Sequence, residues 1–222
     1  MIEIILLVSS ILFIFALKLF GRPSTAHRAN TFAMLAMALA VFSAFNFDFS
    51  KYDSAFYITI VVSGLLGVLI SKRVQMTQMP ELVGLFNGFG GGASGAIAYV
   101  ELSGNSLPLS DVFVAIFSMV IGIFTFSGSL VAVMKLRGKL NNFNKKLADI
   151  FSVFLPTIII IPAVLEMDDL LMEFIILVAI ISGVLRVAVI GGADMPVVIA
   201  FLNSLSGIAA MSAGFIVNSI IL

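Results

Sequence analysis

The chain has 222 residues, of which 61% are hydrophobic and only 11% are charged, and its mean hydropathy is +1.20. Soluble domains carry about a quarter of charged residues, so this composition indicates a protein of the lipid bilayer. The formal net charge is zero, which favours neither nucleic acid nor an acidic ligand. The absence of cysteine and the presence of a single histidine exclude disulfides, cysteine nucleophiles and a histidine-based metal site built from this chain alone.

Eight apolar runs follow one another along the chain, each close to the roughly 20 residues that a helix needs to cross a bilayer. The first run has no basic region before it, so we interpret it as a retained helix rather than a signal peptide. We predict an all-α, polytopic transmembrane bundle that forms one membrane domain over residues 1–222. Its helices are expected at residues 2–20, 31–47, 55–71, 80–100, 111–134, 147–165, 170–190 and 196–218.

Charge predicts the orientation of these helices. Basic residues gather in the loops after the first, third, fifth and seventh helices, whereas the opposite side carries only Lys51. By the positive-inside rule those loops are cytoplasmic and the N-terminus lies outside. The fourth and eighth helices then both run outward from the cytoplasmic face.

These two helices begin alike. Residues 79–93 and 195–209 each open with Met-Pro, and an asparagine stands seven residues after each proline, at Asn87 and Asn203. At about 1.5 Å per residue both amides lie roughly 10 Å along their helices. We interpret the pair of stretches as a parallel internal repeat that places the two asparagines at similar depth.

A carboxamide in lipid is costly unless a polar group meets it. Asn87 and Asn203 therefore suggest a polar path, although a hydrogen bond that only holds helices together is the alternative. Ser129, with Thr125 and Ser127 nearby in the fifth helix, can supply hydroxyls to the path or bond back to its own helix.

Acidic residues stand at the starts of the same helices. Pro80 and Pro196 suit a first helical turn, where a missing N–H is not needed. Asp194 and Glu81 can cap or electrostatically complement these helix ends, or they can serve the mouth of the path.

Glycines are concentrated in the fourth predicted helix. Gly88, Gly91, Gly92 and Gly95 have the spacing that lets helices approach closely, and local kinking is the alternative. A phosphate-binding loop is excluded because no strand precedes these glycines and no P-loop lysine follows.

The residues alone leave open whether the path carries a proton, an ion or a small solute. Three stretches are more specific, at residues 74–83, 125–129 and 190–204. The third of them includes the run Gly-Gly-Ala-Asp-Met-Pro-Val-Val at 191–198. The chain resembles, over essentially all its length, the membrane domain of the beta subunit of proton-translocating NAD(P) transhydrogenase.

The resemblance implies an enzyme assembly that couples hydride transfer from NADH to NADP⁺ to inward proton movement. NAD(H) and NADP(H) would bind to partner soluble domains, so this chain is expected to bind no cofactor or metal and to hold no catalytic residue. Asn87, Asn203 and Ser129 would belong to the proton path. Asp194 and Glu81 would lie at its cytoplasmic mouth, where they couple it to the nucleotide domains.

Some family members have a histidine where this chain has Asn87, and an amide does not titrate near neutral pH. The proton-carrying histidine is then expected on a membrane helix of an alpha subunit. The resemblance also implies a ninth span and an NADP(H)-binding domain beyond residue 222, a dimer of the whole assembly and a bacterial cytoplasmic (inner) membrane. The alternatives are an unrelated secondary transporter or ion-conducting bundle, and a structural membrane scaffold.

Overall fold

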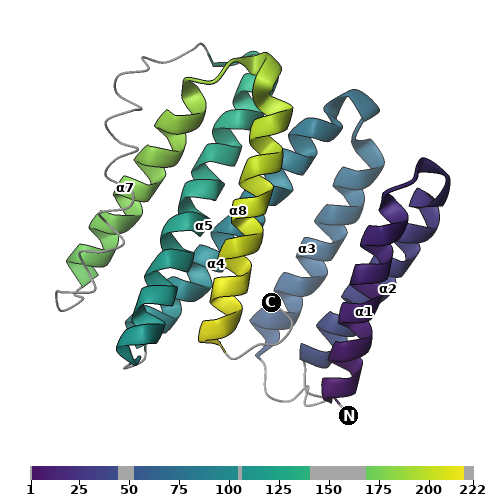
Figure 1. Ribbon diagram of the computed structural model, residues 1–222, viewed down its shortest axis with the longest axis horizontal. Helices are drawn as coiled ribbons and strands as arrows, with labels where there is room; N and C mark the ends of the chain where they lie inside the picture. Colours follow the sequence, from purple (N-terminus) through teal and green to yellow (C-terminus); the bar gives the residue numbers. More distant parts are fainter. Residues whose placement is uncertain (1, 45–52, 105–106, 141–168, 218–222) are drawn as a thin grey trace. The chain divides into compact units, whose positions relative to one another are not determined.

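The computed structural model describes residues 2–44, 53–104, 107–140 and 169–217. All the regular structure in these ranges is helical, which confirms the predicted class (Figure 1). The sixth predicted helix, 147–165, lies outside the described residues. The α-helices are α1 (Ile2–Phe20), α2 (Ala26–Ala44), α3 (Ser54–Arg73), α4 (Met79–Gly104), α5 (Leu109–Leu136), α7 (Asp169–Ala188) and α8 (Met195–Ile216).

Five helical segments of the described chain are long and apolar enough to cross a membrane: α1, α3, α5, α7 and Gly192–Ile216, which contains α8. The helices α2 and α4 are less hydropathic because α2 begins with polar residues and α4 is rich in glycine. A count of eight spans therefore stays a prediction.

The contacts divide the chain into two compact units, and the first is Met1–Arg73. Within it, α1 and α2 form an antiparallel hairpin across a 3₁₀ turn at Pro23–Thr25. The hydroxyl of Ser9 donates a 2.8 Å hydrogen bond to the carbonyl of Ala36 and so ties the two helices together. No residue of α3 is buried.

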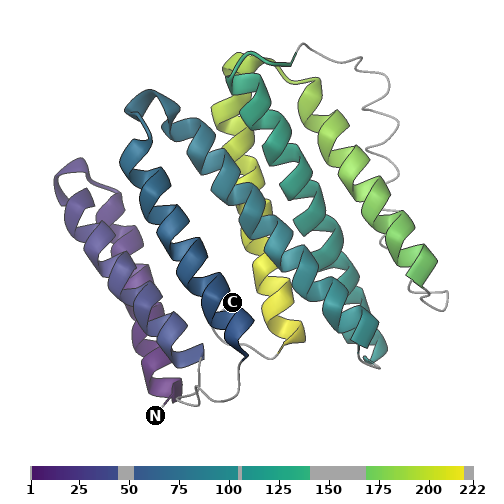
Figure 2. The ribbon, with the colours of Figure 1, turned by 180° about the vertical axis from the view of Figure 1, so that it is seen from behind.

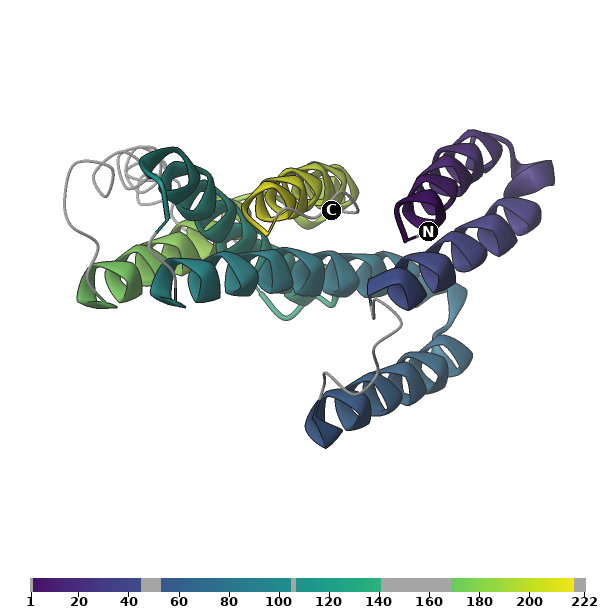
Figure 3. The same cartoon turned by 90° about the horizontal axis from the view of Figure 1, so that it is seen from below.

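The second unit, Val74–Ile220, is organised around α5, which packs against α4, α7 and α8. The helix α8 also lies beside α4, as the view from behind and the view from below both show (Figures 2 and 3). One apolar cluster surrounds Met119 and Ile175, and another surrounds Val131, Met195 and Leu202.

Glycines of α4 make the α4–α5 interface unusually close. A Cβ built at Gly91 would lie 2.9 Å from the carbonyl oxygen of Gly122, and one at Gly88 would lie 3.0 Å from the Cβ of Ser129. Gly92 and Gly95 likewise face side chains of α5 at 3.1 Å. Because α4 stays α-helical through all these positions, the geometry favours close packing over a kink.

The starts of α4 and α8 have the same local structure. A three-residue 3₁₀ turn precedes each helix, at Met76–Gln78 and Gly192–Asp194. Pro80 and Pro196 are each the second residue of their helix. Gly84 faces Ile199 and Gly90 faces Ser206, so α4 and α8 run in the same direction.

Candidate functional site

Three helices of the second unit meet at Asn87. Its side-chain Nδ2 donates a 3.0 Å hydrogen bond to the hydroxyl of Ser129 on α5. Its backbone carbonyl accepts a 3.4 Å bond from the hydroxyl of Ser206 on α8. Asn87 is 7% exposed and Ser129 is fully buried. The structure thus brings together two of the predicted residues and adds Ser206, which the sequence analysis did not single out.

This cluster holds unused hydrogen-bonding capacity. Within the described residues, Asn87 Oδ1 and Thr125 Oγ1 are enclosed and have no hydrogen-bond partner. Thr125 stands one turn from Ser129 along α5, and its Cβ lies 3.0 Å from a Cβ built at Gly91, one turn from Asn87. An enclosed polar atom without a partner costs about 1–3 kcal/mol. Ordered water or a functional role commonly accounts for such an atom in a native structure.

Asn203 lies outside this contact. The register of α4 and α8 puts it at about the level of Asn87, because the facing pairs Gly84–Ile199 and Gly90–Ser206 bracket both asparagines. Asn203 is nevertheless exposed, and its side chain forms no hydrogen bond in the part of the chain that the structure describes. Its neighbour Leu202 points inward and is 1% exposed. Ala200, Ser204 and Gly207 share the exposed face with Asn203.

The two predicted acidic residues lie at the end of the unit where α4 and α8 begin, in different states. Glu81 Oε2 forms an ion pair with Arg137 Nε at 2.6 Å, which joins the first turn of α4 to the residue after α5. Asp194 precedes α8, is exposed and makes no side-chain cap. The N–H of Met195 instead bonds the carbonyl of Gly192. The side-chain cap considered for Asp194 is therefore not formed.

Lys135 is a residue whose environment the sequence analysis missed. Lys135 begins a basic stretch that continues with the exposed Arg137 and Lys139, yet Lys135 itself is only 6% exposed. Its Nζ donates to the carbonyl oxygen of Ile190 at 2.5 Å. A signal was present, because Lys135 follows the buried Val131 by four residues and Gly128 by seven, on one helix face.

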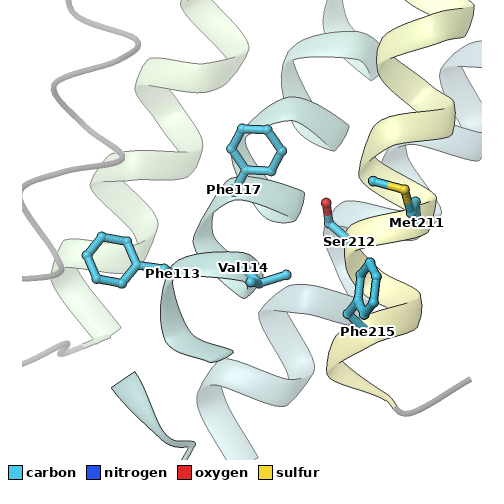
Figure 4. A pocket seen from close by; sticks show the side chains of 6 residues that line it. All are labelled: Phe113, Val114, Phe117, Met211, Ser212 and Phe215. Atoms are coloured by element: carbon cyan, nitrogen blue, oxygen red, sulfur yellow. The ribbon is translucent and has the colours of Figure 1, made fainter. Parts of the chain in front are cut away.

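Two open apolar grooves lie on the second unit. One, of about 390 Å³, lies between α5 and α8. The hydroxyl of Ser212 in its lining donates to the carbonyl of Ile208 within α8. The other, of about 470 Å³, runs along α4, α5 and α7 past Phe89 and Tyr99. The described residues contain no cluster of three or more metal-ligating side chains. The first groove is lined by Phe113, Val114, Phe117, Met211, Ser212 and Phe215 (Figure 4).

Comparison with known proteins identifies the family of the chain. The family model of the NAD(P) transhydrogenase beta subunit matches residues 2–222. The chain belongs to this family. Two curated relatives from Rhodospirillum rubrum, both named NAD(P) transhydrogenase subunit beta, are 31% identical over 224 residues. The alignments cover 94% of this chain and 48% of each relative, so the chain spans about half the length of these relatives.

Family membership confirms the resemblance found in the sequence. It agrees with the five membrane-compatible helical segments of the described chain, and the protein is a membrane component of its family. The match extends over both units and includes all the residues of the Asn87 cluster.

Proposed function

We propose that this chain forms the proton-translocating membrane part of an NAD(P) transhydrogenase, which couples hydride transfer from NADH to NADP⁺ to inward proton movement. The observation that carries the proposal is the enclosed contact between Asn87 and Ser129, with an amide oxygen left unpaired. A family of membrane proteins that move protons needs such polar groups within lipid, where they are otherwise costly. The match to the NAD(P) transhydrogenase beta subunit family supports this choice of reaction.

Neither Asn87 nor Ser129 titrates near neutral pH, so their part is to orient hydrogen bonds rather than to hold the proton. The titrating group is a histidine on a membrane helix of an alpha subunit. Asn203 contributes from the exposed face of α8, at the level of Asn87. A polar residue on such a face is unfavourable against lipid, which supports a partner helix there.

At the end of the unit where α4 and α8 begin, the Asp194 carboxylate forms no ion pair in the described residues. Glu81 forms an ion pair with Arg137. Asp194 faces the cytoplasmic NADP(H)-binding domain, and both nucleotides bind to partner soluble domains. The chain itself supplies no catalytic residue for hydride transfer. The chain spans the bacterial inner membrane eight times, with its N-terminus outside. Its helices α4 and α8 form a parallel repeat. The whole assembly is a dimer.

The test is proton translocation by the assembled enzyme in vesicles during transhydrogenation. Asn87→Leu replaces the amide with an apolar side chain. We expect this change to lower the rate of proton uptake at least about tenfold, equivalent to about 1.4 kcal/mol of activation free energy. The matched control is Ser94→Ala, since the buried Ser94 donates its hydroxyl to the carbonyl of Gly90 in its own helix. Wild-type proton uptake by Asn87→Leu would remove the cluster from the path.

A further inference from the structure

The last turn of α5 carries a lysine that turns inward. Lys135 is 6% exposed, whereas Met134 beside it is 43% exposed and Lys139 is exposed as well. A lysine at a helix end normally extends its ammonium into water and covers apolar surface with its stem. An enclosed ammonium requires a strong acceptor, because its desolvation is otherwise uncompensated.

One such acceptor belongs to the turn between α7 and α8. The Nζ of Lys135 donates a 2.5 Å charge-assisted hydrogen bond to the carbonyl oxygen of Ile190. The N–H of Ile190 bonds the carbonyl of Val187 in the last turn of α7, and the N–H of Asp194 bonds that of Gly191. The ammonium therefore holds a turn whose backbone is already hydrogen-bonded at both ends.

A second contact holds the far side of the same turn. Met195 is fully buried and packs in the apolar cluster that includes Val131 and Ala132 of α5. Asp194 stands between Met195 and the anchored Ile190, with its side chain exposed. The backbone on either side of Asp194 is therefore held against α5 by one polar contact, at Ile190, and one apolar contact, at Met195.

We propose that Lys135 is a positioning residue, which holds the turn at residues 189–194 against α5 and so fixes the backbone from which the exposed Asp194 side chain projects. Arg137, two residues later, pairs directly with the Glu81 carboxylate at the start of α4. The end of α5 and the residue after it thus contact Glu81 directly and the Asp194 turn through its backbone. The consequence for coupling rests on the proposed function of Asp194, whereas the positioning itself does not.

The absence of native cysteine permits a direct measurement on the full chain in membranes. Ala193→Cys, at an exposed position of the turn, provides one thiol for a nitroxide spin label. In that background we expect Lys135→Met to raise the label's rotational mobility at least about twofold, and Lys135→Arg to restore it by keeping a charged donor. The matched control is Lys139→Met, which removes an exposed cation four residues away and should leave the mobility unchanged.

The same variants, without the label, are then compared in the assembled enzyme by the number of protons translocated per hydride transferred. Lys135→Met should lower this ratio at least about threefold, and Lys135→Arg should keep it, a rescue that a general loss of stability would not show. Unchanged label mobility in Lys135→Met overturns the proposal, as does increased mobility in Lys135→Arg equal to that of Lys135→Met. Increased mobility with a wild-type ratio supports the positioning role and contradicts the function proposed for Asp194.

Discussion

Asn87 and Asn203 stand at the same spacing after a proline, yet they have different surroundings. Asn87 is enclosed by α5 and α8 and has a hydrogen-bond partner in Ser129. Asn203 lies at about the same level on the exposed face of α8. A rotation of about 100° per residue separates Asn203 from the buried Leu202, and this places the amide outside the contact.

The exposure of Asn203 separates its function from the stability of the fold. Asn203→Leu should not lower the free energy of unfolding, because the amide has no hydrogen bond to lose in the described residues and an apolar side chain suits lipid. We expect the assembled enzyme to lose proton translocation at least about tenfold. Thermal unfolding and proton uptake in vesicles measure the two effects.

Met211→Leu serves as the control for Asn203→Leu, since Met211 is 49% exposed on the same helix and carries no polar group. Retention of wild-type proton uptake by Asn203→Leu would place this amide outside the path.

Substitution of Asp194 by asparagine distinguishes a role of its negative charge from a role in helix capping. Because its side chain makes no cap, Asp194→Asn should keep the thermal stability of the assembled enzyme within about 0.5 kcal/mol. The loss of the carboxylate charge should weaken the dependence of NADPH oxidation on an imposed proton gradient. Glu173→Gln, at an exposed position of α7, is the charge-matched control. A gradient dependence equal to that of the wild type would show that the charge is not used.

At the scale of elements, the α4–α5 interface depends on glycine at both helices. A Cβ built at Gly122 would lie 2.8 Å from the backbone nitrogen of Gly95 and closer still to the carbonyl oxygen of Gly91. Backbone atoms cannot turn aside as side chains do, so the helices themselves must separate. The same separation would open the contact of Asn87 with Ser129.

Gly122→Ala should therefore destabilise the fold by about 1–3 kcal/mol, as overpacking does in other close interfaces. The control is Gly64→Ala, because nothing lies within 4 Å of a Cβ built at Gly64 in α3. Alanine is the better helix former, so this control should be neutral or slightly stabilising. Thermal unfolding followed by circular dichroism compares the two, and equal midpoints would contradict the close packing.

In the described ranges, the helix bounds agree with the apolar runs to within a few residues, with one larger difference. The second helix begins at Ala26, five residues before the predicted start at residue 31. His27 and Arg28 are helical although they are polar, because the 3₁₀ turn at Pro23–Thr25 starts the helix before the apolar run. The run predicts where a helix is hydrophobic, and the turn determines where it begins.

At the scale of the whole molecule, the chain spans about half the length of its curated relatives. We expect the 222-residue chain by itself to bind neither NAD(H) nor NADP(H) and to transfer no hydride. Dinucleotide-binding folds place the pyrophosphate on a glycine-rich turn between a strand and a helix. The described ranges contain no strand.

Isothermal titration of the purified chain with NADPH measures this expectation, and an assembly with the NADP(H)-binding domain is the positive control. A stoichiometric site of micromolar affinity on the chain would contradict the division of labour proposed between membrane and soluble parts.

Composition and local order in the sequence predict the bilayer environment, the helices of the described ranges, the paired Met-Pro starts and the family. They do not predict which side of each helix is enclosed. Only the packing of the helices buries Asn87 and leaves Asn203 exposed, directs Lys135 towards Ile190 and places Ser206 beside α4. Lipid-facing and core-facing side chains of membrane helices are equally apolar, so hydrophobic periodicity does not identify the inner face.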